Sequence, residues 1–332
     1  MLDTKTLHLL KDTKNLLAFS AGVDSSALFF LLLKHKIPFD IAIVNYNTRK
    51  QSLDELAYAN ELAKIHKLKC FSYSCEKIEK NFESKAREIR YNFFENLIQE
   101  HKYKNLLTAH HLGDRFEWML MQFCKGAGCA EIAGMKVIES RDSYNIVRPL
   151  LQLDKQELLH YLQDNNLKYF EDESNLDEDI KRNEFRHNYS MPLLNKYLSG
   201  IKKSFDYIDS DREILIQEVQ VQTIDSLGYF KNTDNMRTNI FTIDKYLKSQ
   251  NYMLSAKERE LLKGNKTVVV GRKFVINQDN RYIFIANFIQ NTPMTKEFKE
   301  LCRALKIEPK LRPYLYQNSK SFLKLKELLG SV

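Results

Sequence analysis

The first 110 residues alternate between short apolar runs and longer amphipathic runs. The short runs predict strands, and the longer runs predict helices between them. A strand–helix rhythm at this spacing is typical of a parallel sheet covered on both faces. We therefore expect an α/β fold with a parallel, doubly wound sheet. The predicted strands are residues 15–19, 40–46, 69–74 and 104–110, and the predicted helices are residues 25–36, 52–67, 84–102 and 111–126.

The rhythm stops after residue 166, and the chain then changes character. Residues 195–220 carry a helical pattern, whereas residues 266–288 predict two or three strands. Turns between those strands are expected at Gly271-Arg272 and Asp279-Asn280. These changes predict three parts, namely an α/β domain at 1–195, a helical connecting region at 196–232 and a small basic α+β region at 233–332.

Polar residues cluster just after three of the predicted strands, at 20–25, 45–49 and 110–117. Ligands of open parallel sheets bind at the carboxyl ends of the strands. The stretch at 20–25 reads S-A-G-V-D-S and enters a helix at once, so its backbone N–H groups and the helix N-terminus can hold a phosphate. Ser20 and Ser25 add hydroxyls, and Asp24 suits a phosphate-bound Mg²⁺ or an ordinary helix cap.

The glycine spacing of this loop differs from that of two common nucleotide-binding loops, the P-loop and the dinucleotide-binding loop. Neither G-x-x-x-x-G-K-[ST] nor G-x-G-x-x-G occurs in the chain. Gly22 permits a close approach of the backbone to a ligand. Ala21, in contrast, predicts a backbone without a positive φ at its position.

The S-A-G-V-D-S loop resembles the S-G-G-x-D-S loop of the ATP pyrophosphatases, which grip pyrophosphate and transfer an adenylyl group. Three more blocks resemble those of the tRNA(Ile)-lysidine synthetases, and all four follow the family's order. They are A-R-E-I-R-Y at 86–91, A-H-H-L-G-D-R-F-E at 109–117, and R-P-L-L at 148–151 with D-E-S-N…R-N-E-F-R at 172–186.

The chain departs from this family pattern at several positions. Gly113 stands where the family has the first of two adjacent aspartates, so no second metal carboxylate is expected there. Trp118 replaces a threonine and Lys125 an arginine. Tyr46 and Asn47 replace a histidine and a glycine, so we expect an adenosine pocket of different construction.

The resemblance implies an adenine nucleotide alpha hydrolase-like fold and a ligase that modifies tRNA. The implied reaction joins L-lysine to C2 of cytidine 34 in the CAU anticodon of tRNA(Ile), through an adenylated cytidine, and yields lysidine, AMP and pyrophosphate. ATP is the implied substrate and Mg²⁺ the implied metal ion. The modification would change codon reading from AUG to AUA and tRNA identity from Met to Ile.

The resemblance also implies site residues. The implied ATP-binding residues are Ser20, Ala21, Gly22, Val23, Asp24 and Ser25, and the implied metal ligand is Asp24. The other implied catalytic residues are Arg90, His110, Asp114 and Glu117, of which Asp114 and Glu117 also bind lysine. The residues implied to contact tRNA or nucleotide are Arg87, Asn175, Arg182 and Arg186.

Several of these roles have alternatives. Arg87 and Arg90 share a helix face, where they stabilise phosphate charge or pair with Glu83 or Glu95. His110 contacts the α-phosphate or, like Asp114, takes a proton from the lysine amine. Asp114 and Glu117 bind the amines of lysine or complement the helix dipole.

Charge and cysteine content restrict the partners. Residues 231–332 hold 20 Lys and Arg against 9 Asp and Glu, a net charge of +11 within a chain total of +8. This asymmetry predicts contact with the tRNA backbone, or else a solvated basic surface.

The five cysteines form no C-x-x-C pair, so buried thiols are expected rather than zinc or disulfides. No apolar run is long enough for a membrane helix, and we expect a cytoplasmic protein. A homodimer is one option for its oligomeric state.

Two alternative functions remain at this point. A tRNA thiolation enzyme would share the ATP loop, but that chemistry often uses paired cysteines. A non-catalytic nucleic-acid-binding protein on the same fold would explain the missing carboxylate at Gly113.

Overall fold

The computed structural model describes residues 2–47, 51–76, 78, 81–141, 143–171, 181–290 and 292–330, with the backbone alone at residue 181. The chain divides between Asp209 and Ser210 into two units. This division lies inside the predicted connecting region 196–232. No helix in these described ranges is both long and apolar enough to cross a membrane.

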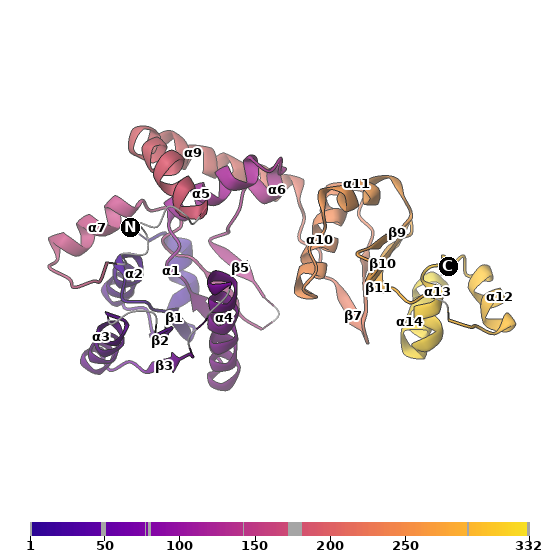
Figure 1. Ribbon diagram of the computed structural model, residues 1–332, viewed down its shortest axis with the longest axis horizontal. Helices are drawn as coiled ribbons and strands as arrows, with labels where there is room; N and C mark the ends of the chain where they lie inside the picture. The colour runs from indigo at the N-terminus through magenta and orange to yellow at the C-terminus, as the bar shows by residue number, and fades with distance from the viewer. Residues whose placement is uncertain are drawn as a thin grey trace. The chain divides into compact units, whose positions relative to one another are not determined.

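The first unit is built on a six-stranded sheet (Figure 1). Its strand order is β3-β2-β1-β4-β6-β5, and every neighbouring pair is parallel except β5 with β6. The predicted parallel, doubly wound class is confirmed. The strands are β1 (Asn15–Ala18), β2 (Phe39–Asn45), β3 (Cys70–Ser74), β4 (Asn105–Leu107), β5 (Ile138–Ser140) and β6 (Asn145–Val147).

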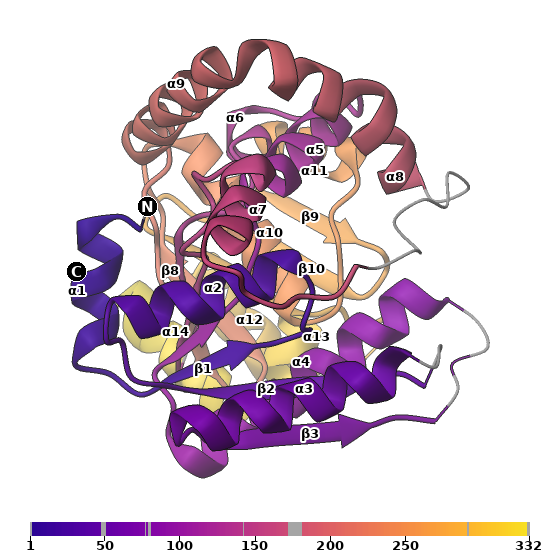
Figure 2. The same ribbon diagram turned by 90° about the vertical axis from the view of Figure 1, so that its left-hand side faces the viewer.

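Helices cover both faces of this sheet because neighbouring strand residues point to opposite sides. Leu17 of β1 belongs to the core beneath α2, α3 and α7, whereas Leu16 belongs to the core beneath α4. Figures 1 and 2 show α2 and α3 together on one side of β1–β3. The helices are α1 (Thr4–Lys11), α2 (Val23–Lys34), α3 (Gln51–His66), α4 (Phe82–His101), α5 (Leu112–Phe123), α6 (Cys129–Ile132) and α7 (Lys155–Asp164).

A further helical segment follows residue 180. It consists of α8 (Lys181–Phe185), the π-helical turn η2 (Arg186–Ser190) and α9 (Met191–Leu215). Leu112 and Phe116 of α5 pack against Leu194 and Phe205 of α9. This contact fixes α5, which carries much of the site described below.

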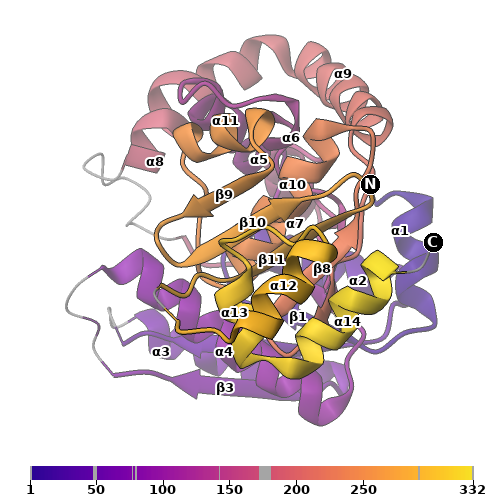
Figure 3. The ribbon, with the colours of Figure 1, turned by 90° about the vertical axis from the view of Figure 1, so that its right-hand side faces the viewer.

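The second unit is a five-stranded antiparallel sheet in the order β7-β8-β11-β10-β9 (Figure 3). The strands are β7 (Gln222–Ile224), β8 (Leu227–Lys231), β9 (Thr267–Val270), β10 (Phe274–Gln278) and β11 (Tyr282–Asn287). β7 and β8 lie at the end of the predicted helical connecting region, yet they belong to this sheet. Gly271 and Arg272 both have positive φ, as a tight turn between β9 and β10 requires.

The second sheet is also covered on both faces. Ile276 and Ile285 pack under α10 (Met236–Ser249) and α11 (Ala256–Gly264). Val275 and Phe284, one position away along the strands, face the opposite core. That core is completed by α12 (Lys296–Ala304), α13 (Arg312–Gln317) and α14 (Ser319–Gly330).

Candidate active site

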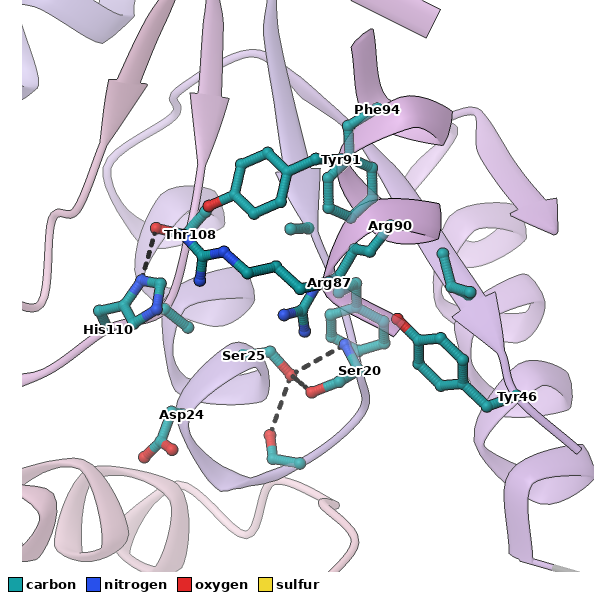
Figure 4. A pocket seen from close by; sticks show the side chains of 15 residues that line it. Ser20, Asp24, Ser25, Tyr46, Arg87, Arg90, Tyr91, Phe94, Thr108 and His110 are labelled. Carbon is teal, nitrogen blue, oxygen red and sulfur yellow. Dashed lines mark hydrogen bonds between the residues drawn. The ribbon is translucent and has the colours of Figure 1, made fainter. Parts of the chain in front are cut away.

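The loop between β1 and α2 holds its two serines together. Ser20 and Ser25 place their Oγ atoms 3.1 Å apart, and the Ser20 backbone N–H donates to Ser25 Oγ at 3.2 Å. The Ser25 hydroxyl in turn donates to the Gly22 carbonyl at 3.1 Å. These bonds close the loop over the N-terminus of α2 (Figure 4). The hydroxyls and the helix end meet at one point, as an anion site requires.

Ala21 corrects one sequence expectation. It has φ of +59°, the left-handed conformation that alanine was expected to exclude, and it is fully buried. Its carbonyl accepts hydrogen bonds from Phe170 N–H and from the Ser26 hydroxyl. These two bonds and the surrounding core hold a conformation that costs an alanine about 1–2 kcal/mol. Gly22 instead has an ordinary φ of −73°.

A pocket opens above this loop, lined by the ends of β1, β2 and β4 and by one face of α4 (Figure 4). Ser20, Gly22, Asp24 and Ser25 form its floor. The Ala21 and Val23 side chains belong to the core below. The pocket therefore lies at the carboxyl ends of the strands, where the topology predicts a ligand.

Two arginines of α4 line the same pocket. Arg87 and Arg90 both reach it, and the Arg87 guanidinium lies 5.0 Å from the centre of the Tyr91 ring. Among the described residues neither arginine forms an ion pair with Glu83 or Glu95, and Glu95 accepts a hydrogen bond from Tyr144. In the described part of the chain, the two arginines therefore do not form the alternative surface salt bridges with Glu83 or Glu95. Two guanidinium groups face the pocket, as phosphate binding requires.

Tyr46, which replaces a family histidine, forms part of the pocket wall. Its hydroxyl donates to the Ala86 carbonyl of α4 at 3.1 Å, and its ring meets Phe82 edge-on. The Tyr46 side chain therefore joins the end of β2 to α4.

Asp24 lies in the first turn of α2 with a carboxylate that lacks a full set of partners. Its Oδ1 atom is buried without a hydrogen bond from the described part of the chain. Burial raises the pKa of this carboxyl group, although His111 and Lys155 oppose the shift. An unsatisfied carboxylate oxygen beside a phosphate loop fits a hard cation such as Mg²⁺.

His110 follows β4 and is held by its neighbour. Its Nδ1 atom lies 2.9 Å from Thr108 Oγ1. Burial, with help from Arg148, Arg182 and Arg90, lowers the pKa of His110 to about 4, against the pull of Asp114. The imidazole is therefore neutral at physiological pH.

His111, the second histidine of the pair, is a site residue that the sequence analysis did not select. Its Nδ1 atom accepts a hydrogen bond from the Gly113 N–H at 3.0 Å. Its Nε2 atom lies 3.9 Å from Asp24 Oδ2 and 3.7 Å from Asp114 Oδ2. The histidine pair and the glycine at position 113 were the signals in the sequence.

Asp114 and Glu117 lie one turn apart on α5 and face two arginines. Asp114 Oδ1 is 2.6 Å from Arg182 Nη2 and 3.8 Å from Arg186 Nη2. Glu117, which is 2% exposed, binds Arg182 Nε at 3.1 Å and Arg186 Nε at 2.7 Å. An interaction with the helix dipole alone would not explain the contacts of Asp114 or those of Glu117 with the two arginines.

Burial alone would raise the pKa of Asp114, but its surroundings reverse that effect. His111, His110 and Arg182, together with the His111 backbone N–H, hold the pKa well below its usual range. Asp114 is therefore ionised at physiological pH. A carboxylate held this firmly is a poor proton acceptor.

Other elements fix the position of α5. The buried Arg115 binds both carboxylate oxygens of Asp209 at 2.5 and 3.0 Å and the Ala133 carbonyl at 3.0 Å. Its guanidinium also lies 4.2 Å from the centre of the Phe205 ring. Asn175 and the neighbouring Asp172 and Ser174 lie outside the described residues, as do Thr48 and Arg49.

The chain is similar to known proteins over most of its length. A family model described as the PP-loop domain matches residues 2–193. The chain is 46% identical over 319 residues to a tRNA(Ile)-lysidine synthase of Helicobacter pylori, covering 95% of this chain and 94% of that protein. It is 45% identical over 308 residues to the Wolinella succinogenes protein of the same name, covering 92% and 94%.

One solved structure supports the fold alone. The U34-tRNA thiolase NcsA from Methanococcus maripaludis matches 67% of this chain and 81% of its own, with a TM-score of 0.52 and 19% identity. The matches to the two synthases extend beyond the first unit and confirm the resemblance carried by the four sequence blocks. The chain belongs to the tRNA(Ile)-lysidine synthase family of PP-loop enzymes.

Proposed function

We propose that this protein ligates L-lysine to C2 of cytidine 34 in the CAU anticodon of tRNA(Ile), with ATP as the source of energy. The observation that carries the proposal is its similarity to tRNA(Ile)-lysidine synthases over nearly the full length of both chains. The ATP pocket alone would not identify the molecule that is adenylated, because PP-loop enzymes with different substrates share such a pocket. The likeness to the thiolase concerns only the fold, so the thiolation alternative is not favoured.

The reaction proceeds in two steps, each with a balanced exchange of groups. The C2 oxygen of the cytosine attacks the α-phosphate of ATP, and pyrophosphate leaves. The ε-ammonium of lysine then releases one proton to water, and the free amine attacks C2. The C–O bond breaks, AMP leaves with that oxygen, and the new C–N nitrogen releases a second proton to water. Both steps depend on positioning and on positive charge around the phosphates.

The residues of the pocket fit the first step. Ser20, Ser25 and the α2 N-terminus hold the pyrophosphate end of ATP, and Arg87 and Arg90 face the phosphates from α4. Asp24 would hold Mg²⁺ through Oδ1, which accepts no hydrogen bond from the residues that the structure describes. The metal, when bound, would screen the negative charge that separates as pyrophosphate leaves.

His110 serves better as a hydrogen-bonding group than as the base for lysine. A free ε-ammonium has a pKa of about 10.4, roughly six units above that of His110. Proton transfer across this gap would cost about 9 kcal/mol. We therefore propose that neutral His110, oriented by Thr108, forms a hydrogen bond with an α-phosphate oxygen. Asp114 is no better as a base for the lysine amine, because its pKa is also low.

Asp114 and Glu117 remain the proposed binding site for the amines of lysine. In the structure both carboxylates already contact Arg182 and Arg186. A cationic amine entering there must replace one of these guanidinium contacts. Lysine binding would then be coupled to the position of the two arginines, which we propose contact tRNA or nucleotide.

The basic region from residue 231 to the end is proposed to bind the tRNA backbone, since it carries a net charge of +11. Its alternating basic and aromatic side chains suit contact with single-stranded bases as well. A tRNA-modifying enzyme of this kind would work in the cytoplasm.

The direct test is transfer of radiolabelled lysine to tRNA. The protein is incubated with ATP, Mg²⁺, labelled lysine and an isoleucine tRNA with a CAU anticodon. The expected result is label in the tRNA that depends on ATP and is lost with Asp24→Ala. ATP cleavage without lysine transfer would identify a different nucleophile and overturn the proposal, and a complete lack of turnover would favour a binding protein.

A further inference from the structure

Gly113 is the second residue of α5, and the imidazole of His111 occupies the space where its side chain would be. A Cβ atom at position 113 would lie 2.7 Å from His111 Cε1 and 3.0 Å from Nδ1. Real Cβ atoms essentially never approach that closely, so any other residue would displace the ring. The observed ring position thus depends on glycine at this place.

The hydrogen bond from Gly113 also fixes how the imidazole is oriented. Because Nδ1 accepts from the Gly113 N–H, Nε2 is the ring nitrogen that carries a proton. Nε2 lies within ion-pair distance of two carboxylates, 3.9 Å from Asp24 Oδ2 and 3.7 Å from Asp114 Oδ2. The side chains of His111 and Asp114 are 8% and 13% exposed and that of Asp24 is 31% exposed, so water screens the two carboxylates from each other only in part.

We propose that His111 is a positioning residue that holds Asp24 toward the nucleotide-bound metal and keeps it apart from Asp114, and that Gly113 is required for this role. The inference rests on the proposed function of Asp24. Without the imidazole between them, two carboxylates from different helices would repel each other, and Asp24 would lose its orientation. Groups that orient a metal-binding carboxylate are typically worth about 10- to 100-fold in metal affinity.

The role of Gly113 leads to a counterintuitive expectation for an aspartate at that position. Gly113→Asp adds a carboxylate next to Asp114 in the chain, yet its Cβ displaces the His111 ring. We expect this variant to bind the metal–nucleotide complex more weakly than the wild type.

Three variants separate the positioning role from a structural one. His111→Asn keeps an acceptor for the Gly113 N–H, since asparagine is a good helix N-cap, but removes the N–H that faces the carboxylates. Gly113→Ala displaces the ring without adding charge. Gly200→Ala, in α9, adds a methyl group where no atom lies within 4 Å and is the matched glycine control.

The readouts are Mn²⁺ binding in the presence of ATP, followed by electron paramagnetic resonance, and the KM for Mg-ATP. We expect His111→Asn and Gly113→Ala to weaken Mn²⁺–ATP binding about 10- to 100-fold and to raise the KM for Mg-ATP. Gly200→Ala should match the wild type. The melting temperatures of His111→Asn and Gly200→Ala should stay close to the wild-type value, because the N-cap is kept in His111→Asn. Gly113→Ala should melt at a slightly lower temperature, because it displaces the ring that caps the Gly113 N–H.

Each outcome decides one question. Unchanged Mn²⁺–ATP binding in His111→Asn overturns the inference, and so does tighter binding in Gly113→Asp. If Gly113→Ala does not fold, His111→Asn alone decides. If instead Asp24→Asn binds Mn²⁺–ATP as well as the wild type, the proposed metal-binding role of Asp24 fails, which is a separate result.

Discussion

At the residue scale, the conformations of Ala21 and Gly22 in the loop between β1 and α2 differ in an unexpected way. Ala21 has the positive φ, whereas Gly22 has a conformation open to any residue. Among the described residues, a Cβ at Gly22 would meet nothing closer than 3.6 Å, so we attribute the glycine there to the proposed close approach of a phosphate. Ala21 is tolerated because the core and two hydrogen bonds to its carbonyl fix it in place.

The loop therefore predicts opposite results for two neighbouring substitutions. Ala21→Gly relieves about 1–2 kcal/mol of backbone strain but loses a buried methyl and adds freedom to the unfolded chain, each worth about 0.5–1 kcal/mol. We expect its melting temperature to stay within about 3 °C of the wild type, with activity retained. Gly22→Ala should fold equally well and lose at least tenfold in kcat/KM for ATP. Loss of folding in Gly22→Ala, or normal activity, would contradict the role of the loop.

The lowered pKa of His110 predicts a pH profile. The folded pKa of about 4 lies below the unfolded value of about 6.5, so the folded state disfavours the charged ring. The stability gained from this group is complete above pH 6.5 and decreases as the pH falls toward 4. Between pH 6 and 8 His110 stays neutral, and His110→Gln should lower lysine transfer about 100-fold without changing the shape of the pH profile. An acid limb near pH 6.5 that disappears in His110→Gln would show that His110 titrates as a base.

At the scale of elements, α5 is tied to α8 and η2 by the four charges of Asp114, Glu117, Arg182 and Arg186. Glu117 is the most buried of them and touches both arginines. Removing one partner of a buried ion-pair network leaves the others uncompensated. Glu117→Gln keeps the size and one hydrogen-bonding oxygen, so it is the mildest probe of this network.

If lysine binds at Asp114 and Glu117, Glu117→Gln should raise the KM for lysine at least tenfold while the KM for ATP changes less than threefold. The reason is that the charge removed would face a lysine amine, not the phosphates. Steady-state kinetics with each substrate varied in turn measures this, and thermal unfolding checks the fold. An equal rise in the KM for ATP would mean that Glu117 acts through Arg182 and Arg186 on the nucleotide.

The same elements show what the sequence could and could not predict. The alternation from β1 to α5 was readable because buried parallel strands form short apolar runs between helical patterns. The three-residue strands β5, β6 and β7 were too short to show a period. The contact between Glu117 and Arg182 joins residues 65 positions apart, so no local pattern indicates it. The positive φ of Ala21 was missed because tertiary contacts override the preference of alanine.

At the scale of the whole molecule, charge and chemistry are separated along the chain. The proposed ATP pocket belongs to the first unit, whereas the basic excess lies in residues 231–332. Each unit has its own sheet and its own buried clusters. Substitutions on the basic surface should therefore affect tRNA binding without changing the ATP pocket.

This separation predicts how salt and charge reversal act on the intact enzyme. Neutralising about five phosphates would make tRNA affinity fall at least 100-fold between 50 and 200 mM salt, while the KM for lysine changes little. Lys266→Glu with Lys273→Glu reverses two exposed charges beside the β9–β10 hairpin, and Lys64→Glu with Lys69→Glu reverses two exposed charges in the first unit. The first pair should weaken tRNA binding by at least tenfold and reduce the salt dependence, and the second should do neither. Equal effects of both pairs in a filter-binding assay would mean that the overall charge of the protein, and not its basic C-terminal surface, attracts the tRNA.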